Sequence, residues 1–324
     1  MANPAYGNLF DPVKVTAIVG DQWVNESKVV QSGIIQLNPT PLQGTKTYTL
    51  RQRRFQDTSG QAIAIGGTIS PDVRTQTQVD HPIVWRYAST VESPIGDEIA
   101  AKDVTYENVS LAEEIQTTSR QYVDDSAYQT IEAVGAALTG NQVGTGSGTV
   151  SLDLVVQAKA ALGERGMMFN GGAFACNSAV YWKMARLGVV AQTSNTFGIN
   201  AHNAMVNSGL LPENVLGMAP LVSDKFAAVT GTQYYVYLIG QNALKLRGAG
   251  RPNIETASLA SLRQFGNVTN FYVKYGIGFD GVTWGGTSSE KVTDTDLATS
   301  GNWTLSSGYN TKFVQLARLY ITTT

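Results

Sequence analysis

Histidine and cysteine, which supply most nucleophiles and metal ligands in proteins, are scarce in this sequence. Its 324 residues include two histidines, His81 and His202, and one cysteine, Cys176. A zinc or iron site of the His/Cys type usually needs about four such ligands, so one chain cannot assemble it. His81 begins an apolar strand and His202 lies among Asn and Ala residues. We interpret both as partly exposed or locally hydrogen-bonded imidazoles.

Other motifs that could do chemistry are also missing. Cys176 has no histidine near it in sequence and is interpreted as a small buried hydrophobic residue. Asp124 and Asp125 fall on a helix face that polar residues would occupy anyway, and no G-x-S-x-G nucleophile elbow occurs. The sequence therefore predicts no catalytic residues, no cofactor and no metal ligands, and hence no enzyme.

Two glycine-rich stretches invite a phosphate-binding interpretation. Gly144–Gly148 lacks the Lys-Ser/Thr that follows the last glycine of a P-loop, so we interpret it as a flexible loop. Arg247–Arg251 could bind an anion, but a turn beside Pro252 is the favoured interpretation.

The composition indicates an assembly. Hydrophobic residues make up 43% of the chain, enough for a core, whereas charged residues make up only 15%, against about 25% in ordinary soluble proteins. A monomer keeps more surface charge for solubility. A chain that buries much of its surface against copies of itself does not need that charge.

Charge and hydropathy exclude other classes. The net charge is −2 and the isoelectric point about 5.8, which argues against bulk electrostatic binding of nucleic acid. A single cysteine excludes internal disulfides and suits a reducing cytosol. No apolar run is long enough for a membrane span, and the first ten residues lack the layout of a signal peptide. We expect a soluble protein made inside a cell.

The first elements are a helix and a long ribbon. Pro12 favours a helix start, and we expect that helix to continue to about Val30, as a peripheral helix or as an arm that docks on a neighbour. The alternating stretch Thr45–Leu50 and the stretch Ile83–Tyr87 predict the two strands of a β-ribbon. A lone two-stranded ribbon is marginally stable in water, so this one must lie on another surface.

A long helix follows the ribbon. Ser110 and Glu113 form a capping-box pattern, and the apolar residues that follow recur at helical spacing as far as Leu138, before Gly140 ends the helix. Such a helix is a rod of about 42 Å that must cross one whole face of the protein.

The remainder alternates between helices and strands and predicts a mixed α+β fold with long-range strand pairing. The helix that begins at Ser151 is expected to turn Val155 and Val156 inward. We predict helices at 151–163 and 177–187, strands at 173–176, 220–222, 234–239 and 270–278, a continuation of the last at 282–284, a helical turn at 294–298, and closing strands at 303–305 and 313–321.

This order of elements resembles the major capsid proteins of tailed bacteriophages, which have the Hong Kong 97 fold. Cys176–Lys183 resembles the family's N-S-x-x-Y-x-K passage from strand to helix, and Leu221–Asp224 is similar to the strand end that follows it. Gly276–Trp284 and the stretches Asp296–Thr299 and Asn302–Leu305 look like the late strands of one capsid subgroup. Together, in order, these motifs cover most of the chain.

The resemblance implies an α+β, Hong Kong 97-like fold with five segments. They are an N-terminal arm (1–40), an extended β-ribbon loop (41–103), a peripheral domain with the spine helix (104–150), a central domain (151–270), and return strands with a C-terminal extension (271–324). We expect the stretch after Gly285 to add a strand pair or arm that braces neighbours. The arm leaves no room for a cleaved scaffolding segment.

The resemblance also implies a function. Hexamers and pentamers of the chain would form the icosahedral head shell of a virion, assembled in the cytoplasm of a bacterial host. Its partners would be other copies, with scaffolding, portal and decoration proteins. Packaged double-stranded DNA would touch it only weakly and without sequence preference. No membrane is implied.

Contacts between subunits are expected at the ribbon. The basic cluster Arg51, Arg53 and Arg54 is either a solvated strand face or a set of partners for a neighbour's carboxylates. Lys46 is the only lysine in the ribbon proper, and we predict no covalent crosslink from it. The predicted inter-subunit contacts are Lys46, Arg51, Arg53, Arg54, Trp85 and Arg86.

Two alternatives stay open. An encapsulin-type compartment has the same fold and packages enzymes, which the sequence alone does not distinguish from a phage head. A β-rich hydrolase or sugar-binding protein is suggested by the five tryptophans, although such side chains are more often core or interface anchors. These tryptophans are Trp23, Trp85, Trp182, Trp284 and Trp303.

Overall fold

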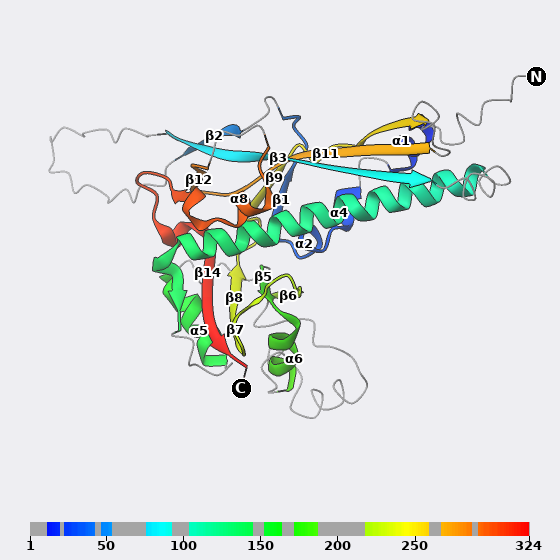
Figure 1. Ribbon diagram of the computed structural model, residues 1–324. Helices are drawn as coiled ribbons and strands as arrows, with labels where there is room; N and C mark the ends of the chain where they lie inside the picture. Colours follow the sequence, from blue (N-terminus) through cyan, green and yellow to red (C-terminus); the bar gives the residue numbers. More distant parts are fainter. Residues whose placement is uncertain are drawn as a thin grey trace, which may run out of the picture.

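One long helix, α4 (Val104–Ala137), organises the molecule. Its 34 residues make a rod of about 51 Å. It crosses the whole width of the protein, with one sheet above it and a second sheet below it (Figure 1). Both sheets pack on this helix and share one buried core with it.

The structure is a computed structural model. It describes residues 12–19, 23–42, 47–53, 76–92, 104–144, 152–163, 172–186, 218–258, 267–286 and 291–323.

The predicted start of the long helix is wrong, and its predicted end and buried stripe are confirmed. The helix begins at Val104, six residues before Ser110, so Ser110 and Glu113 lie as exposed residues within it. A Ser-x-x-Glu pattern fits the solvated face of a helix interior as well as a cap. Ile115 and Ile131 are buried as the spacing predicted, and Leu138 follows the last helical residue.

The upper sheet has the strand order β1-β9-β11-β3-β2, with β10 beside β11. All its pairs are antiparallel except β1 with β9. The long strands β3 and β11 pair from Ile83 opposite Gly276 to Glu92 opposite Asn267. The bounds are β1 (Ile35–Asn38), β2 (Thr47–Arg53), β3 (Gln76–Glu92), β9 (Leu244–Arg247), β10 (Asn253–Ser258) and β11 (Asn267–Phe279).

Alternation along β11 gives the upper sheet two different faces. Phe271, Val273 and Tyr275 are buried in the core with the apolar stripe of α4, whereas Tyr272 and Lys274 point to the other face. The Tyr275 hydroxyl donates to the Tyr122 carbonyl of α4 at 2.8 Å and also contacts the Ser126 hydroxyl at 2.9 Å. These hydrogen bonds fix the sheet on the helix.

The lower sheet has the order β4-β14-β8-β5-β6, with β7 beside β8. Its central pair is antiparallel, from Leu316 opposite Ile239 to Thr322 opposite Gln233. The bounds are β4 (Gln142–Val143), β5 (Ala173–Cys176), β6 (Ala219–Val222), β7 (Ala228–Thr230), β8 (Gln233–Ile239) and β14 (Leu316–Thr322). The strands predicted at 173–176, 220–222 and 234–239 are confirmed.

Both faces of the lower sheet are covered. Tyr237 faces α4, where Gly135 leaves room for its ring: a Cβ at Gly135 would lie 2.7 Å from Tyr237 Cε1. The opposite face packs against helices α5 (Leu152–Ala161) and α6 (Ser178–Arg186). Asn177 caps α6 as predicted, because its side-chain oxygen accepts the N–H of Ala179 at 2.9 Å.

The single helix predicted from residue 12 to about residue 30 is wrong. The chain forms α1 (Pro12–Val19), a short 3-10 turn η2 (Trp23–Glu26) and α2 (Lys28–Gln31). Ser27 is extended and starts α2 as its N-cap. Asp124 of α4 accepts hydrogen bonds from the Ser27 hydroxyl at 2.6 Å and from the Val29 N–H at 3.2 Å. This contact with α4 overrides the local helical preference.

The C-terminal part folds back on α4. β12 (Val282–Trp284) was predicted to continue β11, but the chain turns at Gly281, whose φ is +78°, and β12 pairs with β13 (Trp303–Leu305). Between them lies α8 (Asp294–Ala298), capped by Thr293. The rings of Trp284 and Trp303 meet edge to face at 4.8 Å. The two strands after Gly285 do not pair with each other as predicted, since β13 pairs with β12 and β14 belongs to the lower sheet. α8 and β13 pack on the chain's own long helix, and a bracing contact with neighbours stays a prediction.

The last strand starts later than predicted. A 3-10 turn, η7 (Thr311–Val314), and the left-handed residue Gln315 precede β14, which begins at Leu316 instead of Phe313.

Ile131→Ala tests the role of α4. Ile131 is fully buried, so the substitution should lower the free energy of unfolding by about 2–5 kcal/mol. The matched control, Glu113→Ala, lies on the exposed face of the same helix and should change it by no more than about 0.5 kcal/mol. Urea unfolding followed by circular dichroism measures both. Equal effects would mean that α4 is not a core element.

Candidate assembly surfaces

The titratable side chains of the described residues do not form a metal-binding group. No group of three or more His, Cys, Asp or Glu side chains is placed to bind a metal ion in this part of the chain. Asp124 holds Ser27 and Val29, while Asp125 pairs with Lys225 at 3.2 Å, so the two carboxylates serve separate contacts. His202 and the glycine-rich residues 145–148 lie outside the described residues.

Cys176 is inert in the folded chain. It is fully buried on β5, and burial raises the pKa of its thiol to about 12. The thiolate, which is the reactive form, is therefore nearly absent at neutral pH. This confirms the interpretation of Cys176 as a small buried side chain.

The glycine-rich stretch 247–251 supports packing within the chain. Gly248 has a φ of +71° and donates its N–H to the Asn38 carbonyl at 3.0 Å. The Gly250 carbonyl accepts the indole N–H of Trp23 at 3.0 Å. These contacts favour the interpretation as a turn over an anion site.

The β-ribbon is formed by β2 and the first part of β3. They pair antiparallel from Thr47 opposite Pro82 to Arg53 opposite Gln76. The first predicted strand is therefore present, but the predicted return strand, Ile83–Tyr87, is wrong as a partner for it, because these residues of β3 pair with β11. In Figure 1 the ribbon continues the upper sheet beyond the end of β11. Among the described strands, each half of β3 pairs with one partner, β2 along residues 76–82 and β11 along residues 83–92.

A buried Tyr–His pair fixes the base of this ribbon. The Tyr48 hydroxyl lies 3.0 Å from Nδ1 of His81, and Nε2 of His81 lies 3.1 Å from the Phe279 carbonyl oxygen. A carbonyl only accepts, so Nε2 carries the proton and Nδ1 accepts from Tyr48. Burial lowers the pKa of His81 to about 4, against smaller opposing effects of the Phe279 hydrogen bond and the Asp280 charge. The interpretation of His81 as hydrogen-bonded is confirmed, whereas partial exposure is wrong because the ring is fully buried.

Two glycines of β11 make room for this pair. A methyl group at Gly276 would overlap the ring of Tyr48, and one at Gly278 would overlap the ring of His81. The ribbon can therefore pack in this position on β11 only because Gly276 and Gly278 have no side chain.

The predicted contact residues are placed unequally. Lys46 and Arg54 lie outside the described residues. Arg51 and Arg53 belong to β2, opposite Gln78 and Gln76, and only their backbone is described. Their role between subunits stays a prediction.

Trp85 and Arg86 lie on opposite faces of β3. Arg86 points to the side of α4 and α8, forms an ion pair with Asp294 and donates to the Val292 carbonyl at 3.0 Å. Its side chain is only 14% exposed, and its charge is already used within the chain. Trp85 lies on the other face of the strand.

That outer face carries a group of aromatic and polar side chains, which we call the aromatic face. The Trp85 and Tyr87 rings are nearly parallel at 6.4 Å, and Tyr272 lies 5.8 Å from Trp85 and 5.6 Å from Tyr87. The aromatic face consists of Trp85, Tyr87, Ser89, Glu255, Asn270 and Tyr272.

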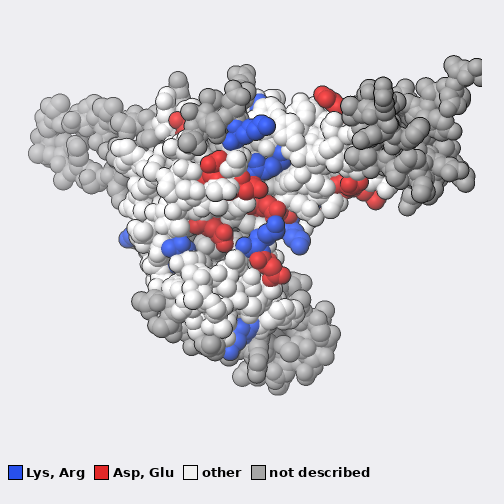
Figure 2. Space-filling view, viewed as in Figure 1, with Lys and Arg blue, Asp and Glu red and all other residues white. Residues whose placement is uncertain are grey.

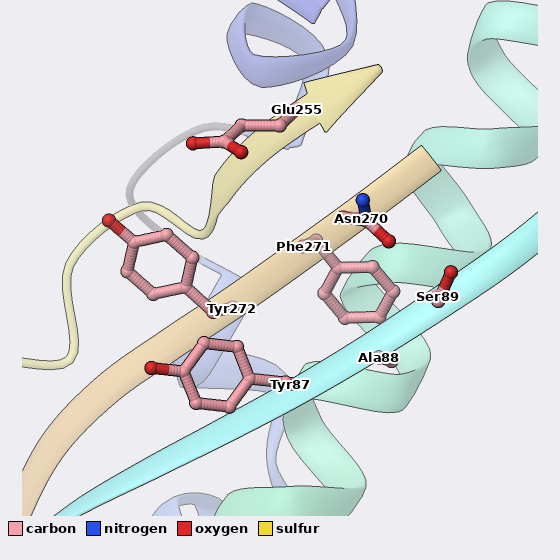
Figure 3. Close-up of a pocket in the computed structure, with 7 residues that line it drawn as sticks. All are labelled: Tyr87, Ala88, Ser89, Glu255, Asn270, Phe271 and Tyr272. Carbon is pink, nitrogen blue, oxygen red and sulfur yellow. The ribbon is translucent and has the colours of Figure 1, made fainter. Parts of the chain in front are cut away.

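A cavity of about 530 Å³ opens on this face. Figure 3 shows the rings of Tyr87 and Tyr272 side by side, from β3 and β11, with Glu255 beside them on β10. Tyr87 is 58% exposed, unusually high for a large aromatic side chain. The grouping of Tyr87, Tyr272 and Glu255 was not predicted, although Trp85 and Tyr87 alternate in the sequence as outward-facing residues of a strand do.

Two further apolar side chains are exposed on the helices of the lower part. Val156 of α5 is 49% exposed, so its prediction as an inward residue is wrong, and Trp182 of α6 is 57% exposed. Trp23, Trp284 and Trp303 are buried instead.

The surface charge is mixed. On the face seen in Figure 2, most described atoms belong to uncharged residues, and acidic and basic side chains alternate over the central region. None of the helices in the described residues combines the length and apolar character needed to cross a bilayer.

The chain is similar to solved capsid structures, although sequence comparisons find no match. No protein-family model and no curated protein sequence matches the chain. Among solved structures, the capsid of the native GTA particle aligns with a TM-score of 0.51 and 11% identity, over 91% of this chain and 90% of that one. The Cyanophage Pam1 capsid aligns at 0.47 and 12% identity, over 93% of both chains. A structure of Mycobacterium phage Che8 aligns at 0.47 and 13%, over 86% and 90%. The first of these likenesses establishes the fold.

The Tyr48–His81 pair predicts a dependence of stability on pH. His81 has a lower pKa folded (about 4) than unfolded (about 6.5), so the unfolded chain binds more protons between these values. Stability is therefore complete above pH 6.5 and falls, by about 3 kcal/mol in all, as the pH decreases to 4. His81→Asn should be less stable at pH 7 but lose less on acidification, as urea unfolding at several pH values would measure. Parallel pH profiles for the two chains would exclude His81 as the cause.

Gly276→Ala tests the base of the ribbon. The added methyl group should displace the Tyr48 ring and lower the free energy of unfolding by about 1–3 kcal/mol. In a Tyr48→Ala background the same substitution should cost much less, because the overlapping ring is gone. A cost that is equal in both backgrounds would place the conflict elsewhere.

Proposed function

We propose that this chain, which has the Hong Kong 97-like capsid fold, is a major capsid protein of the tailed-phage type. Many copies would form the closed head shell of a virion and enclose double-stranded DNA. The role is structural, with no reaction catalysed.

The observation that carries this proposal is the likeness to the GTA particle capsid. It spans 91% of this chain and 90% of that one, so it concerns the fold as a whole rather than one common motif. At 11% identity the likeness establishes fold, and function is inferred from it.

The surface of the chain supports an assembling protein. A low charged fraction, exposed Trp182 and Val156, and the aromatic face all leave apolar area that a dispersed monomer of this size would cover. Aromatic side chains of this kind are typical anchors of protein–protein interfaces.

The ribbon supports contact between neighbouring copies. Its two strands pair with each other and project past the end of β11. Because a two-stranded ribbon is marginal in water, a neighbour's surface is the natural support for it. Arg51, Arg53 and Arg54 would then meet that neighbour.

Finer features of the assembly belong to the same proposal. Hexamers and pentamers would build an icosahedral shell inside the bacterial host, with scaffolding, portal and decoration proteins as further partners. The net charge of −2 fits a wall that holds DNA without binding it tightly, so DNA contacts would be weak and non-specific.

The purified chain should assemble. Light scattering and negative-stain microscopy of the recombinant protein should detect shells, or rings of five and six copies. Glu at all three ribbon arginines should reduce the assembled fraction while circular dichroism stays unchanged. A chain that remains a dispersed monomer at micromolar concentration, even with crowding agents, would contradict the proposal.

A further inference from the structure

The aromatic face is built in rows that cross three strands. Trp85 lies opposite Lys274, and Tyr87 lies opposite Tyr272. In the next row Ser89, Asn270 and Glu255 follow one another across β3, β11 and β10. All these positions share the face that points away from the long helix, since Phe271 and Val273 point toward it.

The rings of this face already accept cations from their own chain. The Lys274 ammonium lies 4.6 Å from the centre of the Trp85 ring, and the Lys291 ammonium lies 5.9 Å from that of Tyr87. The Tyr272 ring completes a triangle with the Trp85 and Tyr87 rings and borders the cavity. Flat aromatic surfaces bind guanidinium groups by stacking and by cation–π attraction.

Glu255 adds a negative charge at the same cavity. Its carboxylate is exposed and has no hydrogen bond or ion pair within the described part of the chain. A carboxylate beside aromatic rings suits an arginine, which can bind the carboxylate with two N–H groups and stack on the rings.

The arginines of the chain's own ribbon cannot reach this cavity. Arg53 pairs with Gln76, and Tyr87 lies eleven positions further along the same straight strand. At about 3.3 Å per residue, this places the Arg53 backbone about 36 Å from Tyr87. Arg51, opposite Gln78, is about 30 Å away by the same measure. A ribbon arginine in the cavity must therefore come from another copy of the chain.

We propose that the aromatic face receives the arginine cluster of the ribbon, Arg51, Arg53 and Arg54, from a second copy of this chain. The inference rests on the proposed function and names the surface on which a neighbour's ribbon lies. At least one guanidinium of the cluster stacks on Tyr87 or Tyr272 and pairs with Glu255.

Crosslinking between two different variants tests this contact. One preparation carries Glu255→Cys, and the other carries a cysteine at residue 51, 53 or 54. The two are assembled together and treated with a short bis-maleimide. A covalent dimer should form in the mixture for at least one ribbon position and stay at background for each variant alone. Cys176 gives little background because it is buried and its thiol is protonated.

Two controls sharpen the result. Wild-type particles measure the background of Cys176. Asp153→Cys, exposed on α5 far from the upper sheet, replaces Glu255→Cys and should leave the dimer at background with the same ribbon variants. Particles that form normally but show no dimer above background would overturn the inference and leave the proposed function standing. If wild-type chains form no particles, both fall.

Substitutions on the face give an independent measure. Tyr87→Ala should raise the protein concentration needed for assembly about tenfold, whereas Tyr87→Phe keeps the ring and should assemble like the wild type. Glu255→Arg should impair assembly, and a glutamate at the contacting ribbon arginine should restore it. Failure of all three charge swaps to restore assembly, or a normal assembly threshold for Tyr87→Ala, would contradict the contact.

Discussion

Burial of both sides of one helix is the constraint on which this structure depends. On one side of α4, hydrogen bonds of Tyr275 to Tyr122 and Ser126 hold the upper sheet. On the other side, the missing side chain of Gly135 admits the ring of Tyr237 from the lower sheet. The ribbon extends from the upper sheet, and helices α5 and α6 pack on the lower sheet. The positions of these outer elements therefore depend on how the two sheets pack on α4.

Local sequence patterns were sufficient for the elements whose burial is continuous. The stripe from Leu111 to Leu138 and the apolar strands 173–176 and 234–239 could be predicted because period and burial agree along each segment. The break at Ser27 could not, since it depends on Asp124, almost a hundred residues away. Strands β1 and β9 were missed because each has only four residues and they pair with each other across some 200 residues of sequence. The turn between β11 and β12 depends on Gly281, which adopts a left-handed conformation. In the sequence, a glycine at this position is equally compatible with a continuous strand.

The aromatic face also depends on strand pairing that local sequence patterns do not predict. Alternation alone suggests that Trp85 and Tyr87 share a face, but only the strand register places Tyr272 and Glu255 beside them, from positions some 170–185 residues later. Arg86 illustrates the reverse: its sequence position suggested an exposed contact, and the pleat turns it inward to Asp294. Which charges remain available to a partner is thus decided by pairing of distant strands, which composition does not encode.

The place of β14 in the lower sheet has a consequence for synthesis on the ribosome. This strand lies between β4 and β8, yet Leu316 is translated 179 positions after Ala137 ends α4. Until β14 is translated, the lower sheet is incomplete. The apolar residues of α4 that face this sheet are therefore not fully covered. Folds dominated by such distant strand pairings form slowly, and their intermediates expose hydrophobic surface and are prone to aggregate. A nascent chain therefore completes its fold only when translation is nearly finished, and association between copies is deferred until then. During this period chaperones would bind the incomplete chain.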